Sequence, residues 1–171
     1  MKIRPATTMD MPWCEEIYAH HVLHGVATMD EVPPDSGHLE AKRANVVQAG
    51  YPFLIIESAG KVLGYAYAAP FRARSAYRFA AEDSIYIHPA HVGQGLARPL
   101  LNQIILHARD QGLKTLIAVI GMDQDQIVEA YPSVRAHANQ GFQHAGCLDF
   151  VGFKFDRWLK TVYMQLDLGT A

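Results

Sequence analysis

Runs of apolar residues, several of them strictly alternating with polar ones, mark seven short stretches of the chain. Such alternation is typical of strands that bury one face in a core. The stretches that predict strands are Lys2–Pro5, Phe53–Glu57, Val62–Ala68, Ser84–His88, Leu116–Ile120, a segment near Gly146–Phe150 and another near Thr161–Leu166.

Four other stretches predict helices, because their apolar residues recur on one helical face. Thr7 and Asp10 form a capping-box pattern before the first, and Gly50 and Gly112 follow the second and third as stops. The apolar positions are Trp13, Ile17, Tyr18 and Val22 in the first helix, Leu39, Val46 and Val47 in the second, and Leu100, Leu101, Ile104, Ile105 and Ala108 in the third; the fourth helix lies near Ser133–Asn139.

This order of elements predicts an α/β fold of the mixed α+β kind, in which a mixed sheet carries helices on both faces. The chain has 171 residues, half of them hydrophobic, which is enough to bury one good core. No linker, repeat or low-complexity run divides it. We therefore expect a single domain over residues 1–171.

The stretch with the clearest chemical meaning runs from Glu82 to Pro89 and on through a loop with alternating glycines, Val92–Ala97. A carboxylate opens an apolar strand, Pro89 ends the strand, and the loop leads into a helix N-terminus. Small residues let backbone N–H groups approach a ligand, and the helix end adds unpaired donors and a positive dipole end. The pattern predicts an anion site beside a base, although an ordinary strand-to-helix turn would have the same residues.

The loop resembles the pyrophosphate-binding loop of the GNAT superfamily of N-acetyltransferases, with Gly95 and Ala97 in register. Val92 stands where that family usually has Arg or Gln. Five further segments are similar to the phosphinothricin and methionine sulfoximine acetyltransferases within the superfamily, and they span nearly the whole chain: Ile3–Ala6, Tyr51-Pro52, Val62–Ala66, Phe71–Glu82 and Gly152–Leu159.

The resemblance implies the GNAT fold, whose central twisted sheet is mixed but mostly antiparallel. It also implies direct transfer of an acetyl group from acetyl-CoA to an amine in a ternary complex, and a homodimer. Glu82 would be the base, directly or through water, whereas the competing interpretation pairs it with a nearby arginine. Acetyl-CoA would contact the backbone of Ile85, Tyr86 and Ile87, the loop residues Gly93, Gln94, Gly95, Leu96, Ala97 and Arg98, and Ser133.

His137 lies in register with the family's acid or cofactor-contacting residue, although a histidine on a helix surface is the competing interpretation. Ala130 replaces the family's usual Asn, and the segment Gly121–Pro132 is several residues longer than is typical. Asp125, Gln126 or Tyr131 could supply the missing contact, and the sequence does not choose among them.

The amine substrate is expected to bind beside Glu82. Guanidinium groups suit a carboxylate or phosphinate through forked hydrogen bonds, although arginines on a solvated loop are common too. The resemblance assigns the substrate site to Arg72, Ala73, Arg74, Tyr77, Arg78, Glu82, Asp83 and Ser84. It also places Met29 in a second substrate loop, where an aromatic residue is usual and where the flexible thioether would admit other substrates.

Composition excludes several other classes of function. The net charge of −2 and the pI near 6.5 give no basic field for nucleic acid. No apolar run reaches the roughly 20 residues of a membrane span, and no signal segment opens the chain, so we expect a cytoplasmic protein. Cys14 and Cys147 are too few for a disulfide framework, and His20 with His24 lacks a third ligand, so no metal is expected.

The function predicted from these features is N-acetylation of the α-amine of a small amino-acid-like compound, of the phosphinothricin, methionine sulfoximine or methionine sulfone type. Two alternatives remain at this point. One is acetylation of a different amine, such as a peptide N-terminus or an aminoglycoside. The other is a non-catalytic acyl-CoA-binding protein, suggested by Val92 and Ala130.

Overall fold

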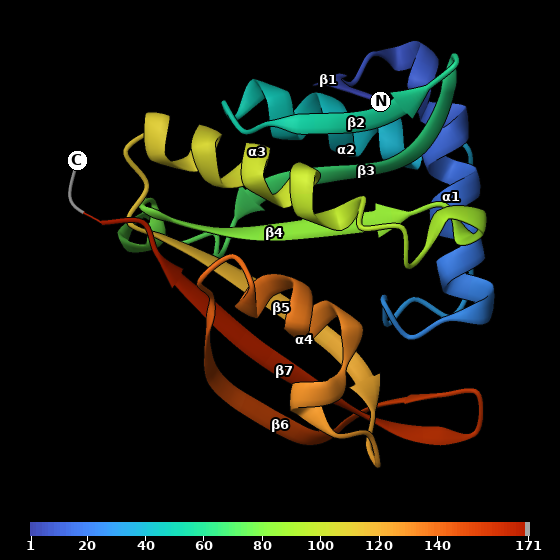
Figure 1. Ribbon diagram of the computed structural model, residues 1–171, viewed down its shortest axis with the longest axis vertical. Coiled ribbons are helices and arrows are strands. Elements are labelled where there is room, and N and C mark those ends of the chain that lie inside the picture. The colour runs from blue at the N-terminus through green and yellow to red at the C-terminus, as the bar shows by residue number, and fades with distance from the viewer. Residues whose placement is uncertain (170–171) are drawn as a thin grey trace.

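The computed structural model describes residues 1–169 and contains one seven-stranded sheet with the strand order β1-β2-β3-β4-β5-β7-β6 (Figure 1). The strands are β1 (Lys2–Pro5), β2 (Phe53–Ser58), β3 (Lys61–Pro70), β4 (Ala80–Ile87), β5 (Thr115–Asp123), β6 (Gln143–Lys154) and β7 (Arg157–Asp167). The helices are α1 (Met11–His24), α2 (His38–Gln48), α3 (Ala97–Asp110) and α4 (Pro132–Ala138). Among them, no helix is long and apolar enough to cross a membrane.

The sheet is mixed and mostly antiparallel, as predicted, because among the seven strands of residues 1–169 only β4 and β5 run parallel. These two strands pair over only four residues, from Ala80 opposite Thr115 to Asp83 opposite Ala118. Beyond Asp83, β4 stays paired with β3 while β5 stays paired with β7. The sheet therefore opens between its two central strands.

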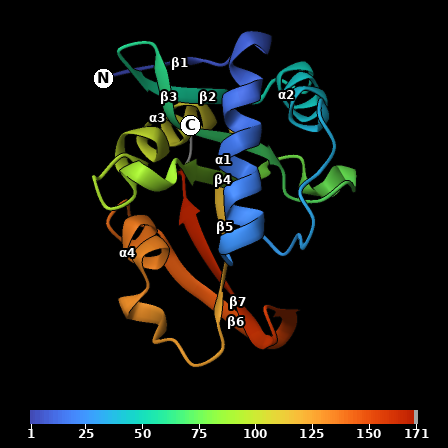
Figure 2. The ribbon, with the colours of Figure 1, turned by 90° about the vertical axis from the view of Figure 1, so that its right-hand side faces the viewer.

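Helices cover both faces of the sheet, also as predicted (Figure 2). Helices α1 and α2 pack on one face over a cluster that includes Phe53 and Tyr65. Helices α3 and α4 lie on the other face over a larger cluster around Leu100 and Ile104. Alternate side chains of the central strands therefore pack into two separate hydrophobic cores, one on each face of the sheet.

The predicted N-terminal cap is present in part. Asp10 accepts hydrogen bonds from the backbone N–H and the hydroxyl of Thr7, at 2.7 and 2.8 Å, and forms an ion pair with Arg4 at 2.8 Å. The hydrogen bond from Arg4 is the main reason that the pKa of Asp10 falls to about 2. This stabilisation is present above the ordinary carboxyl pKa and is lost as the pH falls toward 2.

Several predicted boundaries were wrong. The strand predicted at Ser84–His88 begins four residues earlier, at Ala80, and ends at Ile87. Its charged N-terminal half is part of the strand because it pairs with β3 on one side and with β5 on the other. The two C-terminal strands form one long hairpin that turns at Phe155 and Asp156, both with positive φ. Bulges near Ala145 and between Leu148 and Gly152 break its alternation, which hid its length in the sequence. Two residues predicted on apolar helix faces are instead largely exposed, Trp13 and Val47.

Candidate active site

The two adjacent carboxylates of strand β4, the predicted base Glu82 and the predicted substrate-binding residue Asp83, lie on opposite faces of the sheet. Successive residues of a strand point to opposite sides. Asp83 faces α4, where it meets His137, whereas Glu82 faces the side covered by α1 and α2. Ser84 and Tyr86 share the face of Glu82, and Tyr86 packs against Tyr18 of α1. The sequence placed Glu82, Asp83 and Ser84 together, and the structure separates Asp83 from the other two.

A cavity of about 100 Å³ lies where β4 and β5 part. Its lining comes from both faces of the sheet, with Ser84 and Tyr86 on one side and Asp83, Ile85 and His137 on the other. The opening is therefore a passage through the sheet. A molecule held on the α3 and α4 side can meet one held on the α1 and α2 side at this point.

The edge of β4 offers backbone donors to this opening. His88 donates its N–H to the carbonyl of Leu63 on β3, at 2.9 Å. Because N–H groups alternate in direction along a strand, the N–H of Tyr86 also faces β3, whereas those of Ile85 and Ile87 face the gap. The two isoleucines, rather than all three residues, can bond a ligand there.

A wide groove of about 550 Å³ continues from the opening along the N-terminus of α3. It contains the predicted loop residues Gly93, Gly95, Leu96, Ala97 and Arg98, and on the α4 side Ser133 and His137. Gln94 does not line it, and its side chain bonds to Ala90 and His91 instead. Arg135, which the sequence analysis did not single out, adds a second cation to the groove.

The glycines of the loop are required by backbone conformation. Gly93 and Gly95 have φ of 81° and 76°, in the left-handed region that favours glycine. Within residues 1–169, the N–H groups of Gly93, Gly95 and Leu96 have no hydrogen-bond partner. With the start of α3 they form a cluster of free donors suited to phosphate oxygens.

His137 is buried, with only 6% of its surface exposed, so the alternative of a surface histidine is wrong. Its Nδ1 lies 2.7 Å from the carbonyl oxygen of Ser133, and its Nε2 lies 3.0 Å from Oδ2 of Asp83. Burial works against the charged imidazole. The carboxylate of Asp83 outweighs it and raises the pKa of His137 above the ordinary value.

Glu82 is half-buried and forms no ion pair among the described residues. Burial, with a smaller effect from Asp83, raises the pKa of Glu82 above its usual value, while Arg72 and Lys42 oppose the shift. A carboxyl with a raised pKa is a better base near neutral pH. Lys42 was missed because nothing in the sequence of α2 connects it with β4; its Nζ bonds to the hydroxyl of Tyr67 at 3.0 Å.

The arginine-containing segment between β3 and β4 lies apart from the cavity. Residues 72–79 are exposed, and no residue of the segment lines the opening or the groove. Arg72 stacks on Phe71 and Arg78 on Phe79, at 4.4 and 4.5 Å from the ring centres. Of the three arginines, only Arg72 affects the pKa of Glu82.

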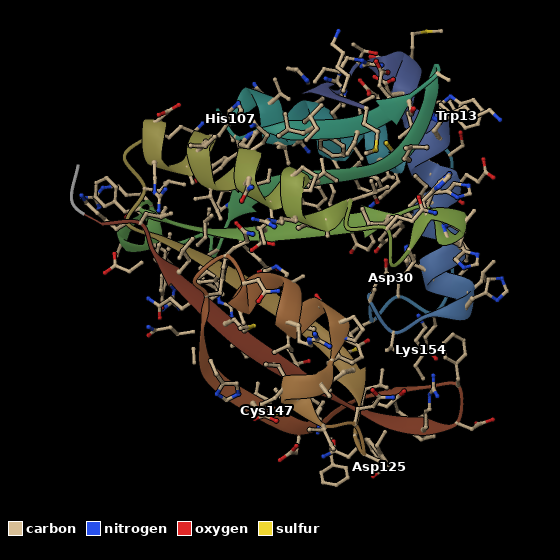
Figure 3. All side chains as sticks on the ribbon, viewed as in Figure 1. Trp13, Asp30, His107, Asp125, Cys147 and Lys154 are labelled. Carbon is tan, nitrogen blue, oxygen red and sulfur yellow. The ribbon has the colours of Figure 1, made fainter. Side chains whose placement is uncertain are left out.

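The long segment Gly121–Pro132 folds against the C-terminal hairpin and brings Tyr131 into the opening. Gln124 bonds to Asp149 at 2.8 Å, and Lys160 donates to the carbonyl of Gln126 at 2.7 Å. Tyr131 lines the cavity beside Ser133 and His137, whereas Asp125 lies at the far end of the molecule (Figure 3). Of the three residues considered for the missing Asn contact, only Tyr131 reaches the site.

The loop between α1 and α2 borders the opening. Ala27 lines the cavity, and buried Lys154 ties the loop to β6 by donating to the carbonyls of Gly25 and Thr28, at 2.9 and 3.1 Å (Figure 3). Met29 lies over Gly121 and Gly152. The loop fits closely because these two sheet positions carry no side chain.

We expect Gly121→Ala to displace this loop. The added Cβ would lie 2.6 Å from the carbonyl oxygen of Val26 and 3.0 Å from Cε of Met29. Overpacking of this kind costs about 1–3 kcal/mol. Urea denaturation should show that loss in the free energy of unfolding, together with a raised KM for the amine. Gly146→Ala, at a strand position with open space around it, is the control and should change neither quantity.

Within residues 1–169, no three His, Cys, Asp or Glu side chains are grouped as metal ligands. His20 and His24 do lie together on α1, with ring centres 4.8 Å apart. Cys14 is a buried thiol whose pKa is raised to about 12 by burial, which leaves it unreactive.

Comparison with known proteins agrees with this geometry. Residues 15–142 match the acetyltransferase (GNAT) family. The chain belongs to that family. This GNAT protein is 46% identical to phosphinothricin N-acetyltransferase from Alcaligenes faecalis, over 99% of this chain and 83% of the relative. It is 37% identical to the L-methionine sulfoximine/L-methionine sulfone acetyltransferase of Salmonella typhimurium, over 98% and 95% of the two chains.

A solved structure extends the comparison to the cofactor. The GNAT superfamily phosphinothricin acetyltransferase from Sinorhizobium meliloti, in complex with acetyl-CoA, has a TM-score of 0.90 and 39% identity. The match covers 98% of this chain and 88% of that one. The predictions of family, fold and cofactor class are therefore confirmed.

Proposed function

We propose that this GNAT protein transfers the acetyl group of acetyl-CoA to the α-amine of a small amino-acid-like compound. Phosphinothricin, methionine sulfoximine and methionine sulfone are the substrates to test, because the relatives named for them match nearly the whole chain. The observation that carries the proposal is the passage between β4 and β5, which joins a groove with free N–H donors to the face of the sheet that carries Glu82.

In this proposal the cofactor lies in the groove, with its phosphates at Gly93, Gly95, Leu96 and Arg98. Its acetyl carbonyl meets the N–H groups of Ile85 and Ile87, which stabilise the negative charge that develops on oxygen. Tyr131 takes the place of the family's Asn contact. The amine enters from the opposite face of the sheet and attacks the carbonyl carbon in the passage.

Glu82 is the proposed base. It does not line the cavity, and it stands two residues ahead of Ser84 on the same face of β4. A water molecule between Glu82 and the ammonium group would carry the proton from the substrate to the carboxylate. The free amine then attacks the thioester directly, with no acyl-enzyme intermediate.

Lys42 and Arg72 are the proposed anchors for the substrate's carboxylate, since both cations oppose the rise of the Glu82 pKa from the substrate side. Arg72→Gln should raise KM for the amino acid about tenfold, the loss of a charge-assisted hydrogen bond. It should also raise the pKa of Glu82 further and move the acidic limb of activity to higher pH. Steady-state kinetics across pH test both effects. Arg109→Gln, an exposed change on α3, is the control, and equal KM values for the two variants would contradict the assignment.

We propose a homodimer that forms through the C-terminal hairpin. The hairpin exposes an unusual set of large apolar side chains. They are Leu148, Phe150, Val151, Phe153, Phe155 and Trp158.

Replacing both Phe153 and Trp158 by serine should convert the dimer to a monomer, because the change removes two large apolar contacts from the proposed interface. Sedimentation velocity measures the effect. Leu106→Ser, an equally exposed leucine on α3, should leave the dimer intact. A wild-type monomer would contradict the proposal.

We also propose that residues 1–171 form one domain and that the protein works in the cytoplasm. Support for the second point is that Cys14 and Cys147 are free thiols, as is usual in a reducing compartment.

Thiol release from acetyl-CoA tests the function. The panel consists of phosphinothricin, methionine sulfoximine, methionine sulfone, ordinary amino acids, a peptide and an aminoglycoside. Turnover on the first three supports the proposal. Turnover only on the peptide or the aminoglycoside would indicate a different class of amine substrate. Binding of acetyl-CoA without turnover of any amine would favour a non-catalytic acyl-CoA-binding protein.

A further inference from the structure

We propose that Tyr131 limits the length of the acyl group that this protein accepts, by closing the pocket that receives the methyl end of the acyl group. Acetyl-CoA fits this pocket, and thioesters of coenzyme A with longer acyl chains are rejected. The inference rests on the proposed acetyl transfer and adds the selection of the acyl donor to it.

The direction of the methyl group follows from the other neighbours of the carbonyl carbon. In the proposed complex the carbonyl oxygen faces the N–H groups of Ile85 and Ile87 at the edge of β4. The sulfur lies toward the groove along α3 and α4, and the amine attacks from the face that carries Glu82. The remaining direction leads across the gap, toward β5 and the segment before α4. The methyl group therefore points to the wall that contains Tyr131.

The cavity at this point has little spare room. Its volume of about 100 Å³ corresponds to about three water molecules, and an acetyl group has three heavy atoms. On the β5 side the cavity is lined by Ala118, Val119, Ile120 and Gly121, whose backbone is held in the ladder with β7. An acetyl group fills this space, so each further methylene group has to displace part of the wall.

Tyr131 is the large side chain of the wall that does not belong to a strand or to a buried pair. Asp83 and His137 are buried and bonded to each other at 3.0 Å, and Tyr86 packs its ring against Tyr18. Tyr131 lies at the end of the segment between β5 and α4, where its half-buried ring packs on the core beneath α3 and α4. Its truncation therefore enlarges the pocket and leaves the sheet intact.

Hydrogen bonds hold the segment that carries Tyr131. The N–H of Tyr131 donates to the carbonyl of Val128 at 3.1 Å, and its own carbonyl accepts the N–H of Arg135 at 3.0 Å. Lys160, with only 9% of its surface exposed, donates its Nζ to the carbonyl of Gln126 at 2.7 Å. A longer acyl chain could move the ring aside only by breaking such bonds.

The ring and the hydroxyl of Tyr131 have separate tasks. The hydroxyl forms no hydrogen bond within residues 1–169, and burial raises the pKa of Tyr131, so the hydroxyl stays neutral and can donate to the cofactor. The ring limits the acyl chain by its size. Phenylalanine keeps the size and removes the hydroxyl, whereas alanine removes both. The two substitutions therefore distinguish affinity for the donor from selection of its length.

The kinetic test compares acetyl-CoA with butyryl-CoA, whose chain is two methylene groups longer, on the amine of the panel that reacts fastest. In the wild type we expect kcat/KM to be about 10²-fold lower for butyryl-CoA, within the range of discrimination by one hydrophobic pocket. Tyr131→Ala should reduce this ratio to about tenfold or less. Tyr131→Phe should keep the ratio and raise KM for acetyl-CoA about fivefold, the loss of one hydrogen bond.

Two results would overturn the proposal. One is a wild type that uses both donors equally well, and the other is an unchanged ratio in Tyr131→Ala. If Tyr131→Ala does not fold, Tyr131→Leu decides in its place, because leucine keeps apolar packing and is shorter than tyrosine.

Tyr51→Ala is the matched control. Tyr51 is also half-buried and packs against both core clusters, but it lines neither the cavity nor the groove. Its truncation should lower the melting temperature and leave the ratio between the two donors at the wild-type value. An equal fall of the ratio in Tyr51→Ala would show that general loosening of the fold, not Tyr131, controls the acyl length.

Binding without an amine separates this inference from the proposed function. Isothermal titration should give a Kd for butyryl-CoA about tenfold above that for acetyl-CoA in the wild type, and nearly equal values in Tyr131→Ala. If no amine is acetylated and this difference in Kd is found, the proposed function fails and the limit on the bound acyl chain stands. If amines are acetylated and the wild type treats both donors equally, the proposed function stands and the role of Tyr131 fails.

Discussion

Replacing Glu82 by glutamine should lower kcat by about 10²-fold or more while the Kd for acetyl-CoA stays within about twofold. The amide keeps the shape of the side chain and cannot accept the substrate's proton. Glu82 lies on the face opposite the groove beside α3 in which the cofactor is proposed to bind, so the groove and its free N–H groups are unaffected. Steady-state kinetics and isothermal titration with acetyl-CoA measure the two quantities.

The pH profile gives this prediction a second readout. Burial raises the pKa of Glu82, so the wild type should gain activity as the pH rises through that raised value. Glu82→Gln should lack this limb. Glu16→Gln, an exposed change on α1, should keep both the limb and the wild-type kcat. Unchanged turnover in Glu82→Gln would remove Glu82 as the base.

Gly95→Ala should weaken acetyl-CoA binding about tenfold. The φ of 76° at Gly95 is unfavourable for an L-residue by roughly 1–2 kcal/mol, and a shift of the loop to relieve it would move the N–H groups of Gly95 and Leu96. A change of 1.4 kcal/mol corresponds to a tenfold change in Kd. The residue has open space around it, so the expected effect comes from the backbone and not from a clash.

Gly60 offers a matched control for this change. It has nearly the same φ, 77°, and equally open surroundings, but it lies in the turn between β2 and β3 and lines neither the opening nor the groove. Gly60→Ala should lower the melting temperature about as much as Gly95→Ala and leave the Kd for acetyl-CoA unchanged. An equal loss of affinity in both variants would show that general destabilisation, not the loop, controls binding.

The sequence predicted the elements well where packing on one face dominates. Helix α3 follows its apolar stripe from Leu100 to Ala108, and β1 matches its predicted range. The two strands of the C-terminal hairpin were predicted too short, and β4 was predicted to begin four residues too late. Bulges interrupt the first, and in the second the adjacent charges of Glu82 and Asp83 resemble a loop until β3 and β5 are known to flank them.

The glycine loop of the site could be predicted from the sequence. The contacts between site residues that are far apart in the chain could not. Gly93 and Gly95 are recognisable from spacing and small size. The bond between Asp83 and His137 joins residues 54 positions apart, and it depends on which face of β4 each carboxylate occupies. The same is true of Lys42, whose relation to Glu82 exists only after α2 packs on the sheet. Neither pair could be recognised from the sequence, because its two residues come together only in the folded chain.

The chemical identity of the product tests the account most directly. Methionine sulfone is incubated with acetyl-CoA carrying ¹³C in its acetyl carbonyl, and the products are followed by NMR and mass spectrometry. We predict a ¹³C amide on the α-nitrogen, formed in equal amount with free coenzyme A and absent with Glu82→Gln. Bound acetyl-CoA with no amide from any amine of the panel would contradict the account.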